Sequence, residues 1–155
     1  MNKLTLSFLI VLIFLSSCGN PKSVLPNTQP LASPSGKWNL KLTQSGGIAG
    51  VLLTIEVTSD GLLKAENQHS QQIVTKILSS QTVIELKKLI FSTISSASHT
   101  TQSACADCFI YDLEIQVDGS NVKIHLDDVT INNSGAQELI AKLTGLRDQA
   151  LKPNP

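Results

Sequence analysis

Apolar and polar residues alternate over two neighbouring stretches in the first half of the chain. The apolar positions are Trp38, Leu40 and Leu42 in the first stretch, then Val51, Leu53, Ile55 and Val57 in the second. A period of two is typical of strands that bury one face, so the pattern predicts a hairpin of half-buried strands. Two weaker strands are predicted over residues 62–66 and 72–78, on either side of a polar bend at residues 67–70.

The apolar spacing then changes to that of a helix. Its predicted apolar face holds Val83, Leu86, Ile90 and Ile94. Thr82, followed three residues later by Glu85, fits a capping box at the start of this helix. The polar residues 95–103 that follow contain too few apolar positions to pack, and they predict an exposed loop.

Alternation returns over residues 109–117 and 122–127, on either side of the turn-forming pair Asp118-Gly119. This is the clearest hairpin signal in the chain. A second helix is expected to begin near Ser134 and to end before residues 152–153. Its apolar side holds Leu139, Ile140, Leu143 and Leu146.

The predicted order of elements is therefore strands, helix, hairpin, helix. Both helices must bury an apolar stripe, and an antiparallel sheet with one apolar face can cover them. We expect an α+β two-layer sandwich, with about four to six antiparallel strands and both helices packed on one face. A single domain over residues 37–151 accounts for these elements, and residues 152–155 are expected to be a disordered tail.

The amino-terminal region has the order of a secretory signal peptide. A positive end at residues 1–3 precedes an apolar stretch over residues 4–15, which is shorter than the about 20 residues that a membrane-spanning helix needs. Leu15-Ser16-Ser17-Cys18 resembles the bacterial lipobox, which implies cleavage after residue 17 and lipid attachment to Cys18. Residues 18–36, rich in proline and polar residues, are then expected to form a tether.

These features predict a lipoprotein anchored by lipid on the extracytoplasmic side of a membrane. Gly19 is not the aspartate that retains lipoproteins at an inner membrane, so the outer membrane is favoured in a diderm organism. The 12 basic residues balance the 12 acidic ones. Without a basic patch, nucleic acid is not an expected partner.

Cys105-Ala106-Asp107-Cys108 is the most specific local motif for chemistry. A disulfide between Cys105 and Cys108 is favoured by an exported location. A redox pair is less favoured because the motif leads into a predicted strand, whereas redox pairs usually open a helix. A metal site would need further ligands, and His99 is the one histidine nearby in sequence.

No other arrangement of residues predicts catalysis, a metal or a cofactor. His69, His99 and His125 lack metal-ligand spacing, and no serine lies in a nucleophile elbow. Asp127 and Asp128 follow a strand and are read as a solvated strand end rather than a calcium site. We therefore expect a binding protein rather than an enzyme.

The segment Gly46-Gly47-Ile48-Ala49-Gly50 lacks the lysine and the following helix of a phosphate-binding loop. Its three glycines predict a turn with positive φ. Together with Ser45, the following strand and the later strand around Tyr111, this segment resembles the emfourins, which are small inhibitors of thermolysin-like metalloproteases. The resemblance covers residues 38–146 and implies a zinc metalloprotease as partner, with Gly46, Gly47 and Gly50 in a protein-binding loop.

A second class of function is an envelope lipoprotein that binds a small apolar ligand or a cell-envelope component. Gly36-Lys37-Trp38 is similar to the start of lipocalins, which enclose an apolar ligand in an eight-stranded barrel. The predicted helix over residues 83–94 and the small number of strands argue against such a barrel. A thiol-redox protein that uses Cys105 and Cys108 is the third and least favoured class.

Overall fold

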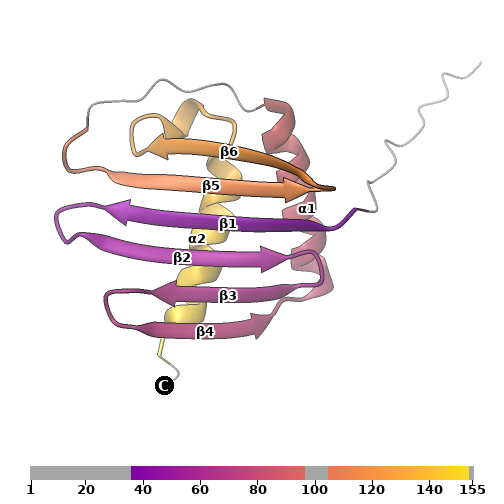
Figure 1. Ribbon diagram of the computed structural model, residues 1–155, viewed down its shortest axis with the longest axis horizontal. Coiled ribbons are helices and arrows are strands. Elements are labelled where there is room, and N and C mark those ends of the chain that lie inside the picture. Colours follow the sequence, from indigo (N-terminus) through magenta and orange to yellow (C-terminus); the bar gives the residue numbers. More distant parts are fainter. Residues whose placement is uncertain (1–35, 97–104, 154–155) are drawn as a thin grey trace, which may run out of the picture. The chain divides into compact units, whose positions relative to one another are not determined.

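The computed structural model describes residues 36–96 and 105–153, which form an antiparallel sheet with two helices on one of its faces (Figure 1). The elements follow the chain in this order: β1 (Trp38–Gly46), β2 (Val51–Thr58), β3 (Leu62–Asn67), β4 (Gln72–Ile77), α1 (Ser80–Ser96), β5 (Phe109–Val117), β6 (Ser120–Asp127) and α2 (Gln137–Leu151). A short 3₁₀ turn, Ile131–Asn133, precedes α2. The predicted α+β two-layer sandwich is confirmed.

The strand order in the sheet is β4-β3-β2-β1-β5-β6. The first four strands are sequential hairpins, whereas β5 returns to the far side of β1 after α1. Trp38 pairs with Val117 at one end of the β1–β5 ladder, and Gly46 pairs with Phe109 at the other. The long-range β1–β5 pairing therefore lies in the middle of the sheet and joins the two halves of the chain.

The core lies between the sheet and the helices, as the alternating pattern predicts. Its fully buried large side chains come from β1, β2, β3, β5, β6 and both helices: Leu40, Leu42, Ile55, Leu63, Leu86, Ile90, Leu113, Ile115, Leu126, Leu139, Ile140 and Leu143. Burial of a leucine or isoleucine side chain stabilises a fold by about 1.5–3 kcal/mol, so this layer supplies the main driving force.

The start and the face of α1 differ from the sequence prediction. Ser79, not Thr82, caps the helix, because the Thr82 amide donates to Ser79 Oγ at 3.2 Å. Glu85 instead accepts a hydrogen bond from Lys142 Nζ of α2 at 2.8 Å, and this bond lowers the pKa of the Glu85 carboxyl. The buried face ends at Thr93, which is 2% exposed, while Ile94 is 37% exposed.

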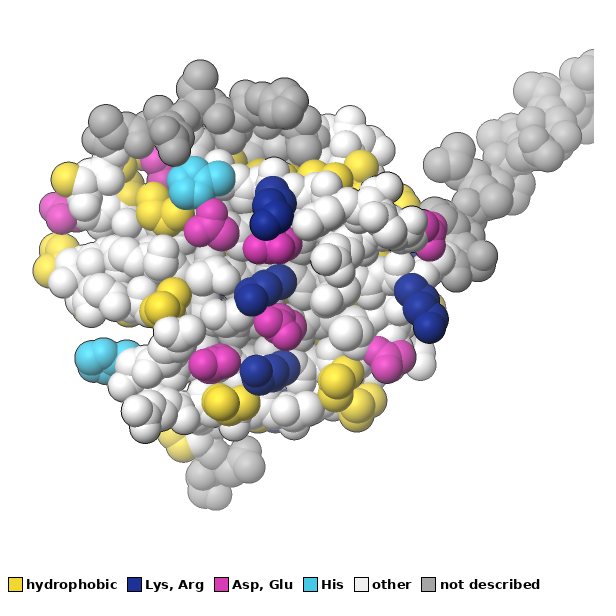
Figure 2. All heavy atoms as spheres, in the orientation of Figure 1, with side chains coloured by type: hydrophobic (Ala, Val, Ile, Leu, Met, Phe, Trp, Pro, Cys, Tyr) yellow, Lys and Arg dark blue, Asp and Glu magenta, His cyan; other side chains and the backbone are white. Residues whose placement is uncertain are grey.

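The face of the sheet away from the helices carries a row of alternating charges. Cross-strand pairing aligns one residue from each of five strands: Lys64, Glu56, Lys41, Glu114 and Lys123. Lys41 Nζ lies 3.4 Å from Glu56 Oε1, and Lys123 Nζ lies 3.5 Å from Glu114 Oε2. Figure 2 shows the row as a column of alternating blue and magenta side chains. Such exposed pairs contribute little stability, but they keep this face polar.

Candidate binding site

The β1–β2 turn is built on glycines that adopt the left-handed backbone. The φ angles are +89° at Gly46, +69° at Gly47 and +58° at Gly50, and the Gly50 amide donates to the Gly47 carbonyl at 3.0 Å. The turn leaves Ile48 at its tip, where 94% of the residue is exposed. The hairpin thus displays an apolar side chain on a closed turn.

The segment that leads into β5 lies against this turn (Figure 1). The Gly47 amide donates to the Cys108 carbonyl at 3.2 Å. A Cβ atom on Gly46 would lie 2.7 Å from that same carbonyl oxygen, and one on Gly47 would lie 2.6 Å from Cε1 of Phe109. Both glycines are therefore required by close packing as well as by their φ angles.

Cys105 and Cys108 close a short loop at this position. Their sulfur atoms lie at bonding distance, and their Cα atoms are 5.5 Å apart, as a disulfide requires. The loop leads into β5, whereas the cysteine pair of a redox protein usually opens a helix. The structure thus brings together the two motifs that the sequence presented separately.

Asp128 fastens the start of β5 to the end of β6. Its Oδ2 accepts a hydrogen bond from the Phe109 amide at 2.8 Å, and its Oδ1 accepts one from the Tyr111 hydroxyl at 3.1 Å. These charge-assisted bonds hold the β5 start, and with it the Cys105–Cys108 loop, against the sheet. The hairpin itself was predicted from the sequence, but this role was missed because Asp128 was interpreted as part of a solvated strand end.

The prediction of a solvated strand end is wrong for Asp127, which is 4% exposed. Asp127 Oδ1 accepts hydrogen bonds from the Val129 amide at 3.0 Å, the Thr130 amide at 2.8 Å and the Thr130 hydroxyl at 2.8 Å. The side chain therefore forms the turn that ends β6. Val129, 59% exposed, lies in this turn.

We call residues 46–50, 105–108 and 128–130 the loop edge. Backbone and carboxylate hydrogen bonds connect its parts, and its turns leave Ile48 and Val129 exposed. Within residues 36–96 and 105–153, no group of three histidine, cysteine or acidic side chains could hold a metal ion. His69 lies in the β3–β4 turn, His125 pairs with Asp112 on the open face, and His99 lies outside the described residues. The arrangement suits binding through shape and apolar contact.

Tyr111 offers a direct probe of the Asp128 clamp, because it is the single tyrosine of the chain. Desolvation raises its pKa above 10.0, the hydrogen bond and charge of Asp128 raise it further, and the charge of Arg147 opposes them. We expect Asp128→Asn to lower the Tyr111 pKa, because the substitution removes the negative charge beside the hydroxyl. An ultraviolet absorbance titration of tyrosinate measures this, and an unchanged Tyr111 pKa in the variant would contradict the clamp.

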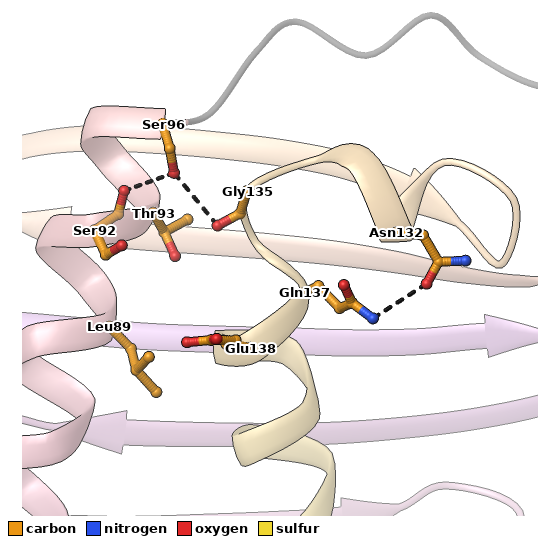
Figure 3. Close-up of a pocket in the computed structure, with 8 residues that line it drawn as sticks. All are labelled: Leu89, Ser92, Thr93, Ser96, Asn132, Gly135, Gln137 and Glu138. Carbon is orange, nitrogen blue, oxygen red and sulfur yellow. Dashed lines mark hydrogen bonds between the residues drawn. The ribbon is translucent and has the colours of Figure 1, made fainter.

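A separate pocket of about 300 Å³ lies between the carboxyl-terminal half of α1 and the start of α2 (Figure 3). Its lining is mostly polar: Leu89, Ser92, Thr93, Ser96, Asn132, Gly135, Gln137 and Glu138. Ser96 Oγ donates to the Ser92 carbonyl at 2.7 Å, and Gln137 Nε2 donates to Asn132 Oδ1 at 3.1 Å. The polar lining and the open sheet differ from the closed barrel and apolar cavity of a lipocalin.

No family model matches the chain, and no curated protein matches it. Among the described residues, neither helix is long and apolar enough to cross a bilayer. Ile48 is a candidate contact residue that was not among the residues predicted from the sequence, although a large apolar side chain within a glycine-rich turn was a visible signal.

Proposed function

We propose that this chain is an exported lipoprotein whose folded part binds another protein through the loop edge. The partner that fits best is a thermolysin-like zinc metalloprotease, which the chain would inhibit as the emfourins do. One observation carries the proposal. Ile48 is 94% exposed on a turn whose backbone is hydrogen-bonded to the Cys105–Cys108 loop.

A fixed loop favours tight binding because little conformational freedom is lost when it docks. Gly46 pairs with Phe109 in the β1–β5 ladder, and the Gly47 amide donates to the Cys108 carbonyl at 3.2 Å, so the start of β5 holds the turn in place. The loop would enter the protease cleft as a preformed ligand. It carries no group positioned for acid–base or nucleophilic attack, which suits an inhibitor that blocks a site.

An exposed apolar side chain at the tip of a rigid turn is a suitable anchor for an interface. Anchors that fill a pocket on the partner carry most of the binding energy of protein complexes. Ile48 would be this anchor, and Val129 would lie at the periphery of the contact. The neighbouring glycines would allow the backbone to approach the partner closely.

The proposed membrane attachment depends on Cys18, which lies outside the described residues together with the predicted signal peptide and tether. Lipid on Cys18 would hold the chain at a membrane, and residues 19–36 would let the folded part reach a partner near the surface. The inhibitor would then act on proteases in the extracytoplasmic space.

The proposal predicts that the full chain inhibits thermolysin-like proteases and that Ile48→Asp weakens the inhibition constant by about 30-fold, the effect of a hot-spot loss of about 2 kcal/mol. The matched control is Ile84→Asp on α1, an isoleucine that is 49% exposed and distant in sequence from the loop edge. Its inhibition constant should equal that of the original chain. Absence of inhibition at micromolar concentration, or equal weakening by both variants, would refute the proposed mode of binding.

A further inference from the structure

The edge strand β4 exposes apolar side chains next to an unpaired strand edge. Ile73 is 58% exposed and Ile77 is 75% exposed, and Leu62 of β3, which pairs with Ile77, is 41% exposed. Figure 2 shows hydrophobic side chains along the lower border of the sheet, where Figure 1 places β4. No described strand pairs with the outer side of β4.

The backbone groups of the same residues point away from the sheet. The Leu78 amide donates to the Gly61 carbonyl at 2.9 Å, so Leu78 directs its hydrogen-bonding groups toward β3. Because this direction alternates along an antiparallel strand, the N–H and C=O groups of Ile73, Thr75 and Ile77 point outward. Outward backbone groups thus lie on three alternate residues, two of which, Ile73 and Ile77, carry exposed apolar side chains.

The opposite edge of the sheet is protected. The row of charges that crosses the open face begins beside Thr75 on β4 and ends at Lys123 on β6. A charged side chain such as Lys123 is a common means of preventing edge pairing. On β4, Lys76 is the single charged residue, and its side chain projects to the other face of the strand. The ladder with β3 is continuous from residue 72 to residue 77, so no bulge interrupts the edge.

We propose that β4 pairs with β4 of a second copy, antiparallel, with a two-fold axis at Thr75. This register places Ile73 of each copy opposite Ile77 of the other copy. The two exposed isoleucines of each β4 strand are therefore covered on the open face. The outward N–H and C=O groups of Ile73, Thr75 and Ile77 are all paired. The six-stranded sheets of the two copies become one continuous sheet.

The charges on the open face tolerate this pairing. At the centre, Thr75 lies opposite Thr75 of the second copy, and hydroxyls face each other rather than like charges. The nearest cations of the charge row, the two Lys64 residues, are three strand spacings apart, or about 14 Å. This exceeds the screening length of about 8 Å at physiological salt. Equivalent pairing of β6 would bring Lys123 side chains together, which is unfavourable.

Cysteine cross-linking of the full chain in its membrane tests the proposal. Cα atoms of a directly opposed hydrogen-bonded pair are about 5.5 Å apart, within the range of about 4.4–6.8 Å that a disulfide spans. After mild oxidation, Thr75→Cys should therefore give a species of twice the monomer mass on non-reducing gels. Asn121→Cys, on the opposite edge strand β6 with Lys123 retained, is the matched control and should stay monomeric, as should the original chain with Cys18, Cys105 and Cys108.

A second variant tests whether the two β4 strands pair in the proposed register. Adding Ile73→Lys to Thr75→Cys should abolish the dimer, because the lysine would lie opposite Ile77 of the second copy. Absence of a Thr75→Cys dimer overturns the proposal. It is also overturned if Thr75→Cys cross-links to a different protein, which would make β4 a site for a foreign strand, or if Asn121→Cys cross-links equally well.

Discussion

Gly46→Ala is expected to lower the free energy of unfolding by about 2–5 kcal/mol. The left-handed backbone costs a residue with a Cβ about 1–2 kcal/mol, and Gly46 has a φ of +89°. Overpacking adds about 1–3 kcal/mol, because the new Cβ would lie 2.7 Å from the Cys108 carbonyl oxygen. The carbonyl oxygen is part of the backbone and the Cβ atom is bonded to it, so neither atom can move away by rotation of a side chain. Relief of the clash requires β1 and the start of β5 to separate.

Urea unfolding followed by fluorescence measures this loss, since the single tryptophan, Trp38, is buried in the core. Gly50→Ala is the matched control: Gly50 has a φ of +58°, but a Cβ there meets no atom within 4 Å. Gly50→Ala should therefore lower the free energy of unfolding only by the cost of the left-handed backbone, about 1–2 kcal/mol. Equal losses in the two variants would mean that the contact between the turn and the Cys105–Cys108 loop contributes nothing.

Asp127→Ala is expected to destabilise the chain by about 2–4 kcal/mol. The substitution removes three hydrogen bonds accepted by Asp127 Oδ1 in a buried position, two of them from the amides of Val129 and Thr130. A buried donor that loses its partner costs about 1–3 kcal/mol. The loss should also loosen the turn that carries Asp128 and Val129.

The control is Asp127→Asn, which keeps an oxygen at the Oδ1 position and should cost less than about 1 kcal/mol. The same fluorescence-detected unfolding experiment compares the two variants. If Asp127→Asn is as unstable as Asp127→Ala, the charge of Asp127 rather than its accepted hydrogen bonds stabilises the turn.

Much of the fold could be predicted from the sequence because apolar and polar residues alternate along β1 and β6 and along much of β2 and β5, whereas the apolar residues of both helices have helical spacing. Trp38, Leu40 and Leu42 alternate with polar residues, and the structure buries all three in the core. The helix start was less predictable. Ser79 and Thr82 can both cap a helix, and a choice between them depends on where the preceding strand ends.

The loop edge could be predicted in its parts but not as a whole. The glycines of residues 46–50 and the pair Cys105 and Cys108 each have a local signature. Their contact arises from the pairing of Gly46 with Phe109, which no local pattern specifies. The error on Asp127 has the same origin: its burial depends on how the segment after β6 packs, and alternation ends there.

The position of β1 between β2 and β5 also determines the order in which the chain can fold. The strands β1 to β4 can form from local hairpins as they emerge, but β1 then remains an unprotected edge. That edge stays open until residues 109–117 are available, and pairing over such a separation is slow. A chain that stops before Phe109 would leave one edge of β1 unpaired. The second half of the sequence therefore acts as a folding partner for the first, and truncated chains should aggregate.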